Sequence, residues 1–249
     1  TEVPTDITVL KHKIFEPYFL ARIFSKKHTS TISSGIISED KEQSFVQKLM
    51  LYIRGNFFMP DARIFWVKPS VYYLEGYLKN HEIDTIITTG TPHSVHLIGL
   101  KLKELMCVRR IADFRDPWTQ IGYHKNLKLT DSSELKHHRL EQKVLDSASH
   151  IITTSFTTKS QFEKQTRTPI TVITNGYDEE PSESIVPDEK FSLAHIGSLL
   201  SERDPQNLWQ VLGELVKEND NFRKDFQLKL VGAVSEDVLR SVKDEALQE

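Results

Sequence analysis

The sequence predicts an α/β protein with two Rossmann-like parallel-sheet domains, the second of them incomplete. Three observations lead to this expectation. Short β-branched runs alternate with helix-length amphipathic stretches, which is typical of parallel strands joined by helices. An acidic stretch with two prolines, at residues 178–190, interrupts the alternation. The alternation then restarts for only two strands, and such a small sheet exposes too much edge to be stable alone.

The first 60 residues give weak signals. Residues 25–41 are rich in Ser, Thr and Lys and are expected to form a surface loop. Apolar residues at helical spacing predict one helix over residues 41–54. A second helix is expected to open at Pro69 and to continue through Leu78.

The regular part of the chain begins at residue 83. Apolar, β-branched runs predict four strands, at residues 83–89, 108–114, 151–154 and 170–173. Apolar residues at helical spacing predict the intervening helices, at residues 95–105, 133–147 and 159–164. We therefore expect a parallel sheet that is covered by helices on both faces.

After the acidic stretch the same rhythm predicts a second domain. Its expected elements are a strand at 191–196, a helix at 205–216, a strand at 226–231 and a helix at 235–247. We expect a first domain over residues 1–176 that lacks its first strand, a linker over 177–190, and the start of a second domain over 191–249.

Composition narrows the class of function. The chain has 249 residues, and 32 Lys and Arg against 35 Asp and Glu give a formal net charge of −3. This near-neutral balance argues against a nucleic-acid-binding protein. The single cysteine, Cys107, excludes an intramolecular disulfide and a cysteine-based zinc site, and its apolar neighbours predict a buried thiol. His93 and His96 have ligand-compatible spacing but no evident third ligand, so we expect no metal site.

The chain shows no sign of a membrane span or of secretion. The longest uncharged stretch, residues 85–100, is interrupted by glycine, proline and histidine. Neither a secretory signal nor an Asn-X-Ser/Thr acceptor occurs. We therefore expect a cytoplasmic protein.

In open parallel sheets, ligands bind outside the carboxyl ends of the strands, so the residues after each strand are the site candidates. Residues 90–94 follow the first predicted strand and open a helix. The helix N-terminus attracts anions, and His93 and Ser94 are placed to contact a sugar or phosphate. The alternative is a tight turn with Thr91 as helix cap and Pro92 in the first helical position.

Residues 112–118 span the end of the second predicted strand and are unusually polar. Asp113 is expected to be held by the sheet edge or by Arg115, whereas Asp116 lies beyond the strand and is the better candidate for a general base or an anchor for a sugar hydroxyl. Arg115 is also suited to a phosphate, and Trp118 to stacking on a sugar ring. The alternative is an Asp–Arg pair that holds a loop, with Trp118 as a lid on the core.

Two further candidates end the fourth and fifth predicted strands. Asn175 and Gly176 are either a simple turn or part of a site. Gly197 lets the backbone approach a ligand closely, and Arg203 and a helix N-terminus follow, a combination that suits a diphosphate. Neither a P-loop nor a G-x-G-x-x-G fingerprint is present, so a plain turn is the alternative here too.

These segments occur in an order that resembles family-4 (group 1) glycosyltransferases, which have the two-domain GT-B architecture. Residues 112–118, ADFRDPW, are similar to the end of one strand in the first domain of bacterial members. Residues 173–178, ITNGYD, resemble the family's junction between the domains. Residues 193–199 and 228–232 resemble the first two strand ends of the second domain. The resemblance covers residues 83–232.

The resemblance implies a transferase that moves a sugar, with retention of configuration, from a nucleotide-sugar donor to a glycan or lipid-linked acceptor, as in polysaccharide biosynthesis. It implies no metal and no cofactor other than the donor itself. Asp116 would be the catalytic residue. The acceptor would meet His93, Ser94, Asp113, Arg115 and Trp118. The donor would meet Gly197, Ser198, Arg203 and Asn175.

The sequence also departs from the family pattern. The glycine-rich loop of the first domain and the paired glutamates of the second, E-x7-E, are expected before Thr1 and after Glu249, and Ser198 stands where many members have arginine. Two other functions remain open: a nucleotide-sugar epimerase of GT-B shape, and a non-catalytic α/β binding module. Peripheral association with the inner face of a membrane is a further open point, as is the oligomeric state.

Overall fold

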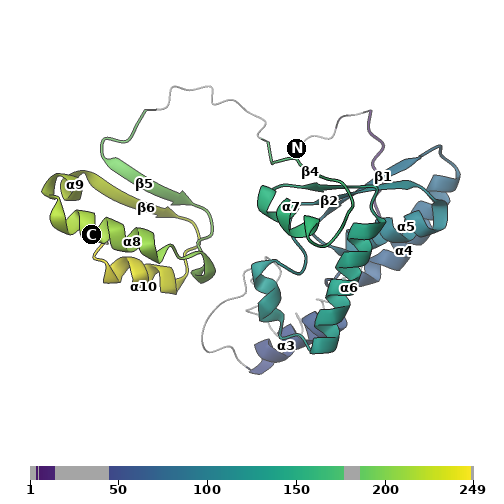
Figure 1. Ribbon diagram of the computed structural model, residues 1–249, viewed down its shortest axis with the longest axis horizontal. Coiled ribbons are helices and arrows are strands. Elements are labelled where there is room, and N and C mark those ends of the chain that lie inside the picture. The colour runs from purple at the N-terminus through teal and green to yellow at the C-terminus, as the bar shows by residue number, and fades with distance from the viewer. Residues whose placement is uncertain (1–3, 5, 15–44, 177–185, 248–249) are drawn as a thin grey trace. The chain divides into compact units, whose positions relative to one another are not determined.

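The chain divides into two compact units, Thr1–Gly176 and Tyr177–Glu249 (Figure 1). The computed structural model describes residues 4, 6–14, 45–176 and 186–247. Each unit consists of a parallel sheet with helices packed on it, so the α/β class predicted from the sequence is confirmed. The two sheets are those of partial Rossmann-like domains.

The first unit contains a four-stranded parallel sheet in the order β1-β2-β3-β4. In the register, Thr88 lies opposite Ala112, and Ala112 lies opposite Ile151. The strands are β1 (Thr85–Gly90), β2 (Arg109–Phe114), β3 (His150–Thr153) and β4 (Ile170–Val172). The connecting helices are α5 (Ser94–Met106), α6 (Asp131–Ser147) and α7 (Phe156–Glu163).

Only one face of this sheet is covered within the described part of the chain. Ala112, Phe114 and Ile151 point into the core, whereas Ile87, on the other face, is 62% exposed. The strands follow one another in a single direction, and right-handed crossovers then place all three helices on the same face. The expectation that helices cover both faces is therefore wrong for these residues.

Two helices precede the sheet, α3 (Phe45–Phe57) and α4 (Ile64–Lys79). Helix α4 packs on α5 through a cluster that includes Leu78, Ile98 and Leu102. It begins at Ile64, more than a turn before the expected start, and so contains Pro69. The expected loop at residues 25–41 and the start of the helix expected at residue 41 fall wholly or partly outside the described residues.

Helix ends follow local capping chemistry. The side chains of Thr130 and Ser155 accept hydrogen bonds from backbone N–H groups three residues on, so α6 and α7 start earlier than their apolar patterns indicated. Cys107 ends α5 in the left-handed conformation, with φ of 55°, and its side chain is exposed. The prediction of a buried thiol is wrong because a residue at this turn points away from the apolar face of the helix.

The second unit has a two-stranded parallel sheet. Its elements are β5 (Phe191–Ile196), α8 (Gln206–Glu218), α9 (Asp220–Asp225), β6 (Phe226–Val231) and α10 (Glu236–Asp244), with a short 3-10 turn at Ser201–Arg203. Helix α9 was not expected from the sequence; the Asn219 side chain caps it. Trp209, Leu212, Val238 and Val242 form the core.

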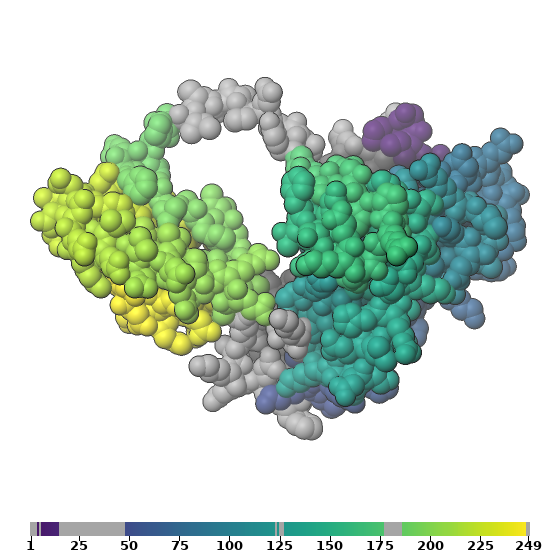
Figure 2. Space-filling model, in the orientation of Figure 1, coloured from purple at the N-terminus to yellow at the C-terminus, as the bar shows by residue number. Residues whose placement is uncertain are grey.

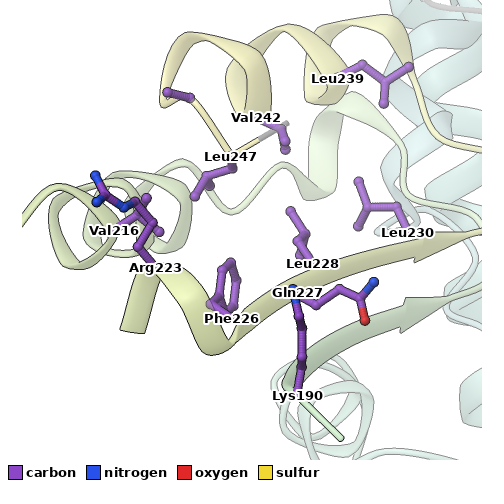
Figure 3. Close-up of a pocket in the computed structure, with 11 residues that line it drawn as sticks. Lys190, Val216, Arg223, Phe226, Gln227, Leu228, Leu230, Leu239, Val242 and Leu247 are labelled. Atoms are coloured by element: carbon purple, nitrogen blue, oxygen red, sulfur yellow. The ribbon is translucent and has the colours of Figure 1, made fainter. Parts of the chain in front are cut away.

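A hollow of about 600 Å³ lies in the second unit between β6 and α10 (Figure 3). Leu228 and Leu230 of β6 face it, as do Leu239 and Val242 of α10. It lies on the helix-covered side of the sheet, whereas the chain that follows Gly197 continues from the strand end. The hollow is therefore separate from the predicted donor loop.

Candidate functional site

The carboxyl ends of all four strands of the first unit meet around Arg115. Its backbone N–H donates to the Gly90 carbonyl after β1, at 3.0 Å. Its carbonyl accepts from the Thr154 hydroxyl after β3, also at 3.0 Å. Its guanidinium donates to the Asn175 side-chain oxygen after β4. Three of the four segments predicted from the sequence thus lie at one edge of the sheet.

The two aspartates of this edge have different surroundings. Asp113 is largely buried, and its carboxylate lies 3.7 Å from the Arg115 guanidinium. Asp116 is exposed and accepts a hydrogen bond of 2.9 Å from the Thr91 hydroxyl. Asp113 is therefore held by an ion pair, while Asp116 keeps oxygen lone pairs available to a ligand.

His93 and Trp118 lie together under this edge. Their rings stack at a centroid distance of 5.1 Å and an interplanar angle of 4°. Trp118 is 2% exposed, and its indole N–H donates to His137 Nδ1 at 3.2 Å. The burial favours the interpretation of Trp118 as a lid on the core, because His93 already covers a face of the indole that a sugar ring would need.

The His93 imidazole is a neutral group at neutral pH. It is 4% exposed, and neither ring nitrogen has a hydrogen-bond partner among the described residues. Burial lowers the pKa of His93 from 6.5 to about 4, although the nearby carboxylates of Asp61 and Asp116 act in the opposite direction. Burial likewise holds the pKa of His96 well below its ordinary value.

Asp61 completes this region, and sequence reasoning missed it. One carboxylate oxygen accepts from the Ser94 backbone N–H at 2.8 Å, and the other accepts from the Ser94 hydroxyl at 2.9 Å. The second oxygen also accepts from the Arg63 N–H at 2.9 Å. The cap on α5 thus comes from a residue 33 positions earlier in the chain, and no local spacing could have indicated it.

The Asp61 contact changes the interpretation of residues 90–94. Thr91 is not the helix cap, because α5 starts at Ser94 and the Thr91 hydroxyl donates to Asp116 instead. Ser94 is fully buried, and its hydroxyl donates to Asp61. A carboxylate therefore already occupies the position at the α5 N-terminus where a phosphate would bind.

The fourth predicted segment lies in the second unit. Gly197 has φ of +133°, and a Cβ added at Gly232 would lie 2.3 Å from the Gly197 carbonyl oxygen, so the two loops are closely packed. Ser198 and Arg203 are exposed, and the Arg203 side chain makes no hydrogen bond or ion pair with any described residue. Helix α8 follows, and no side chain in the described ranges caps its N-terminus.

Asn175 belongs to the first unit. Its side-chain oxygen accepts a hydrogen bond from Arg115, which groups it with the predicted acceptor residues.

The part of the chain that the structure describes contains no cluster of three or more His, Cys, Asp or Glu residues able to hold a metal ion. None of its helices is long and apolar enough to cross a membrane.

Comparison with known proteins identifies the family. The model of "Glycosyltransferase Family 4" matches residues 29–181, more than half of the chain. The chain belongs to glycosyltransferase family 4. The matched region includes the strand-end cluster around Arg115, and the resemblance noted in the sequence is thereby confirmed.

A similar solved structure is the "Glycosylation Associate Protein (Gap123) complex from Streptococcus agalactiae", at 15% sequence identity and a TM-score of 0.35. That match covers 72% of this chain and 32% of the other, so this glycosyltransferase chain spans about a third of that one. No curated protein matches.

Proposed function

We propose that this family 4 chain serves the transfer of a sugar from a nucleotide-diphosphate donor to a glycan or lipid-linked acceptor. The observation that supports it best is the exposed Asp116 carboxylate at the joint carboxyl edge of β1 to β4, inside the family match. Open parallel sheets bind their ligands at this edge.

In this proposal Asp116 receives the acceptor. An exposed carboxylate accepts hydrogen bonds from sugar hydroxyls and is able to take a proton from the attacking one. The Thr91 hydroxyl orients the carboxylate through its 2.9 Å hydrogen bond. Arg115 forms an ion pair with Asp113 and so offsets the charge of the carboxylate nearest to it.

The buried residues of this edge have a supporting role in the proposal. His93, Ser94 and Trp118 form the floor beneath Asp116 and fix the path of the chain between β1 and α5. Neither ring nitrogen of neutral His93 has a partner among the described residues, so a small movement of residues 90–94 would let it share a hydrogen bond with an acceptor.

The donor side of the proposal lies in the second unit. The backbone after Gly197, the Ser198 hydroxyl, the exposed Arg203 and the uncapped N-terminus of α8 together suit a diphosphate. Negative charge that develops on the leaving diphosphate would be stabilised by this cation and these N–H groups.

The same proposal includes transfer with retention of configuration, without a metal, in the cytoplasm beside a membrane. Asn175 remains a proposed donor contact through its free amide hydrogens.

Calorimetry with UDP, GDP, ADP and their sugars tests the donor side. Arg203→Ala is expected to weaken binding of the preferred donor by about 1.5–3 kcal/mol, the range for a hydrogen bond to a charged group. Lys224→Ala, which removes an exposed cation of α9 in the same unit, is the matched control and should leave binding unchanged.

Two results would contradict the proposal. Equal donor affinity in the parent chain and in Arg203→Ala would remove Arg203 from the donor site. Absence of binding to every nucleotide and nucleotide sugar would contradict the transferase and favour the non-catalytic binding module, in which the strand-end contacts are structural.

A further inference from the structure

Helix α6 holds the segment that follows Asp116 through two side chains one turn apart. His137 Nδ1 accepts a hydrogen bond of 3.2 Å from the Trp118 indole. Glu141 accepts two hydrogen bonds from Thr119, one of 3.2 Å from the backbone N–H to Oε1 and one of 2.5 Å from the hydroxyl to Oε2. Residues four apart lie on the same side of a helix, so both contacts come from one face of α6.

This face of α6 is turned away from solvent. Helix α6 runs along the first unit in Figure 1, and atoms of this part of the chain form part of the surface in Figure 2, but Glu141 is 0% exposed. Burial raises the pKa of Glu141, and the hydrogen bonds from Thr119 and from the Trp118 backbone act in the opposite direction. A buried carboxylate destabilises the fold unless its oxygens keep their hydrogen bonds, so Thr119 is confined to one position.

Asp116 lies between two fixed points of the chain. Before it, the backbone N–H and carbonyl of Arg115 are hydrogen-bonded to the segments that follow β1 and β3. After it, Thr119 is bonded to Glu141, and only two residues intervene, the first of them a proline with fixed φ. The backbone of Asp116 is therefore restrained from both sides, and α6 supplies the restraint on the far side.

We infer that Glu141 is a positioning residue, which holds the Asp116 carboxylate in place through Thr119. Because Glu141 is buried, it acts on the reaction through Asp116 and not by contact with a substrate. A displacement of a catalytic group by about 1 Å can lower a rate by about a hundredfold, so a contact outside the site is able to affect the chemistry. The effect on sugar transfer rests on the proposed function, but the positioning itself does not.

The same helix offers an internal control. Asp146 accepts a hydrogen bond of 2.7 Å from the Thr166 hydroxyl, and Thr119 and Thr166 are each 8% exposed. Thr166 precedes β4, whereas Thr119 follows β2, so this second contact lies at the other end of the strands. If Glu141 only stabilised the fold, loss of either contact would have the same consequences for the site.

Hydrogen exchange followed by mass spectrometry tests the positioning directly. Under native conditions, Glu141→Ala should raise amide exchange at residues 115–119 by about tenfold or more, because it removes the buried acceptor of Thr119. Thr119→Val should change exchange in the same direction, and it replaces Glu141→Ala if that variant does not fold. Asp146→Ala should raise exchange at residues 165–168 and leave residues 115–119 unchanged. Unchanged exchange at residues 115–119 without the Glu141 contact would overturn the inference, whether or not the chain transfers sugar.

Release of nucleotide tests the consequence for catalysis. The probe is the nucleotide sugar that calorimetry selects, with water as the acceptor, and rates are compared per folded molecule. Thr119→Val keeps the shape of the side chain but loses the hydroxyl, so it should lower kcat by about tenfold and leave KM within about twofold of the parent value. Thr119→Ser should restore kcat to within about threefold, and Thr166→Val should leave it unchanged.

A double-variant cycle shows whether Thr119 acts through Asp116. If it does, Thr119→Val should add no further loss of kcat to Asp116→Asn, because the group that it positions has already been removed. Additive losses, or an equal fall of kcat in Thr119→Val and Thr166→Val, would overturn the inference. Absence of nucleotide release by the parent chain, together with raised exchange in Glu141→Ala, would contradict the proposed function and leave the positioning intact.

Discussion

At the scale of single residues, the site depends on how its carboxylates are partnered. Asp113 faces Arg115, Asp61 caps α5, and Asp116 is contacted by a single neutral hydroxyl. A carboxylate with strong partners stabilises the fold, and one with weak partners remains available for chemistry. This difference separates the structural aspartates from the functional candidate.

Asp116→Asn is expected to reduce sugar transfer more than it reduces stability. The amide is nearly the same size and still accepts from Thr91, so the structure should be retained, but it is not basic enough to take a proton. The transfer rate and the melting temperature should be measured on one sample. A lowered melting temperature with a normal rate per folded molecule would make Asp116 a structural residue.

Asp61→Ala is expected to lower the free energy of unfolding by about 1–3 kcal/mol. The change removes the helix cap and leaves the buried N–H and hydroxyl of Ser94 without partners. Urea unfolding followed by circular dichroism measures this. Glu82→Ala, at an exposed position before β1, is the control. If both changes lower the free energy of unfolding by the same small amount, water replaces the Asp61 carboxylate as the partner of Ser94.

At the scale of elements, periodicity located the strands and most helices. The strands of both sheets lie where short runs containing apolar residues predicted them, and such a pattern depends on neighbouring residues alone. Features that depend on distant residues were not predictable. The Asp61 cap comes from the segment between α3 and α4, and the open sheet face follows from the strand order.

The candidate site was predicted in part. The rule that ligands bind at the carboxyl ends of the strands grouped Asp113, Arg115 and Asp116, but it could not show that Trp118 is buried.

Four buried histidines are expected to make the first unit less stable in acid. The pKa values of His93 and His124 are lowered to about 4, and those of His96 and His137 are also lowered, mainly by burial. Unfolded histidines titrate near 6.5, so the unfolded state binds more protons between about pH 6.5 and pH 4. Stability is therefore full above about pH 6.5 and falls as the pH drops toward 4, by on the order of 3 kcal/mol for His93.

Urea midpoints at several pH values between 7.5 and 4.5 measure this dependence. Burial raises the pKa of Glu141, which changes the pH dependence of stability in the opposite sense. The contribution of His93 is therefore obtained from the difference between the curves of the parent chain and of a His93 variant. His93→Phe keeps a ring against Trp118 and should flatten the curve, whereas exposed His138→Gln should not. Identical curves for the parent chain and His93→Phe would contradict the assignment.

At the scale of the whole molecule, the two units differ in how much structure supports them. The first has four strands and several helices, whereas the second has two strands, with Ile196 and Val231 exposed on the face away from its helices. A two-stranded sheet has little cross-strand pairing to stabilise it. The second unit is therefore expected to open first.

The tryptophans allow this order of unfolding to be measured. Trp66 and Trp118 lie in the first unit, and Trp209 is buried in the second, where its indole donates to Asp204 at 2.6 Å. In urea, the fluorescence of the parent chain should change in two steps. Trp209→Phe should abolish the step at lower urea and keep the later one at the same midpoint, because its remaining reporters are in the first unit. A single transition that coincides in fluorescence and circular dichroism, and that Trp209→Phe moves as a whole, would show that the units unfold as one cooperative body.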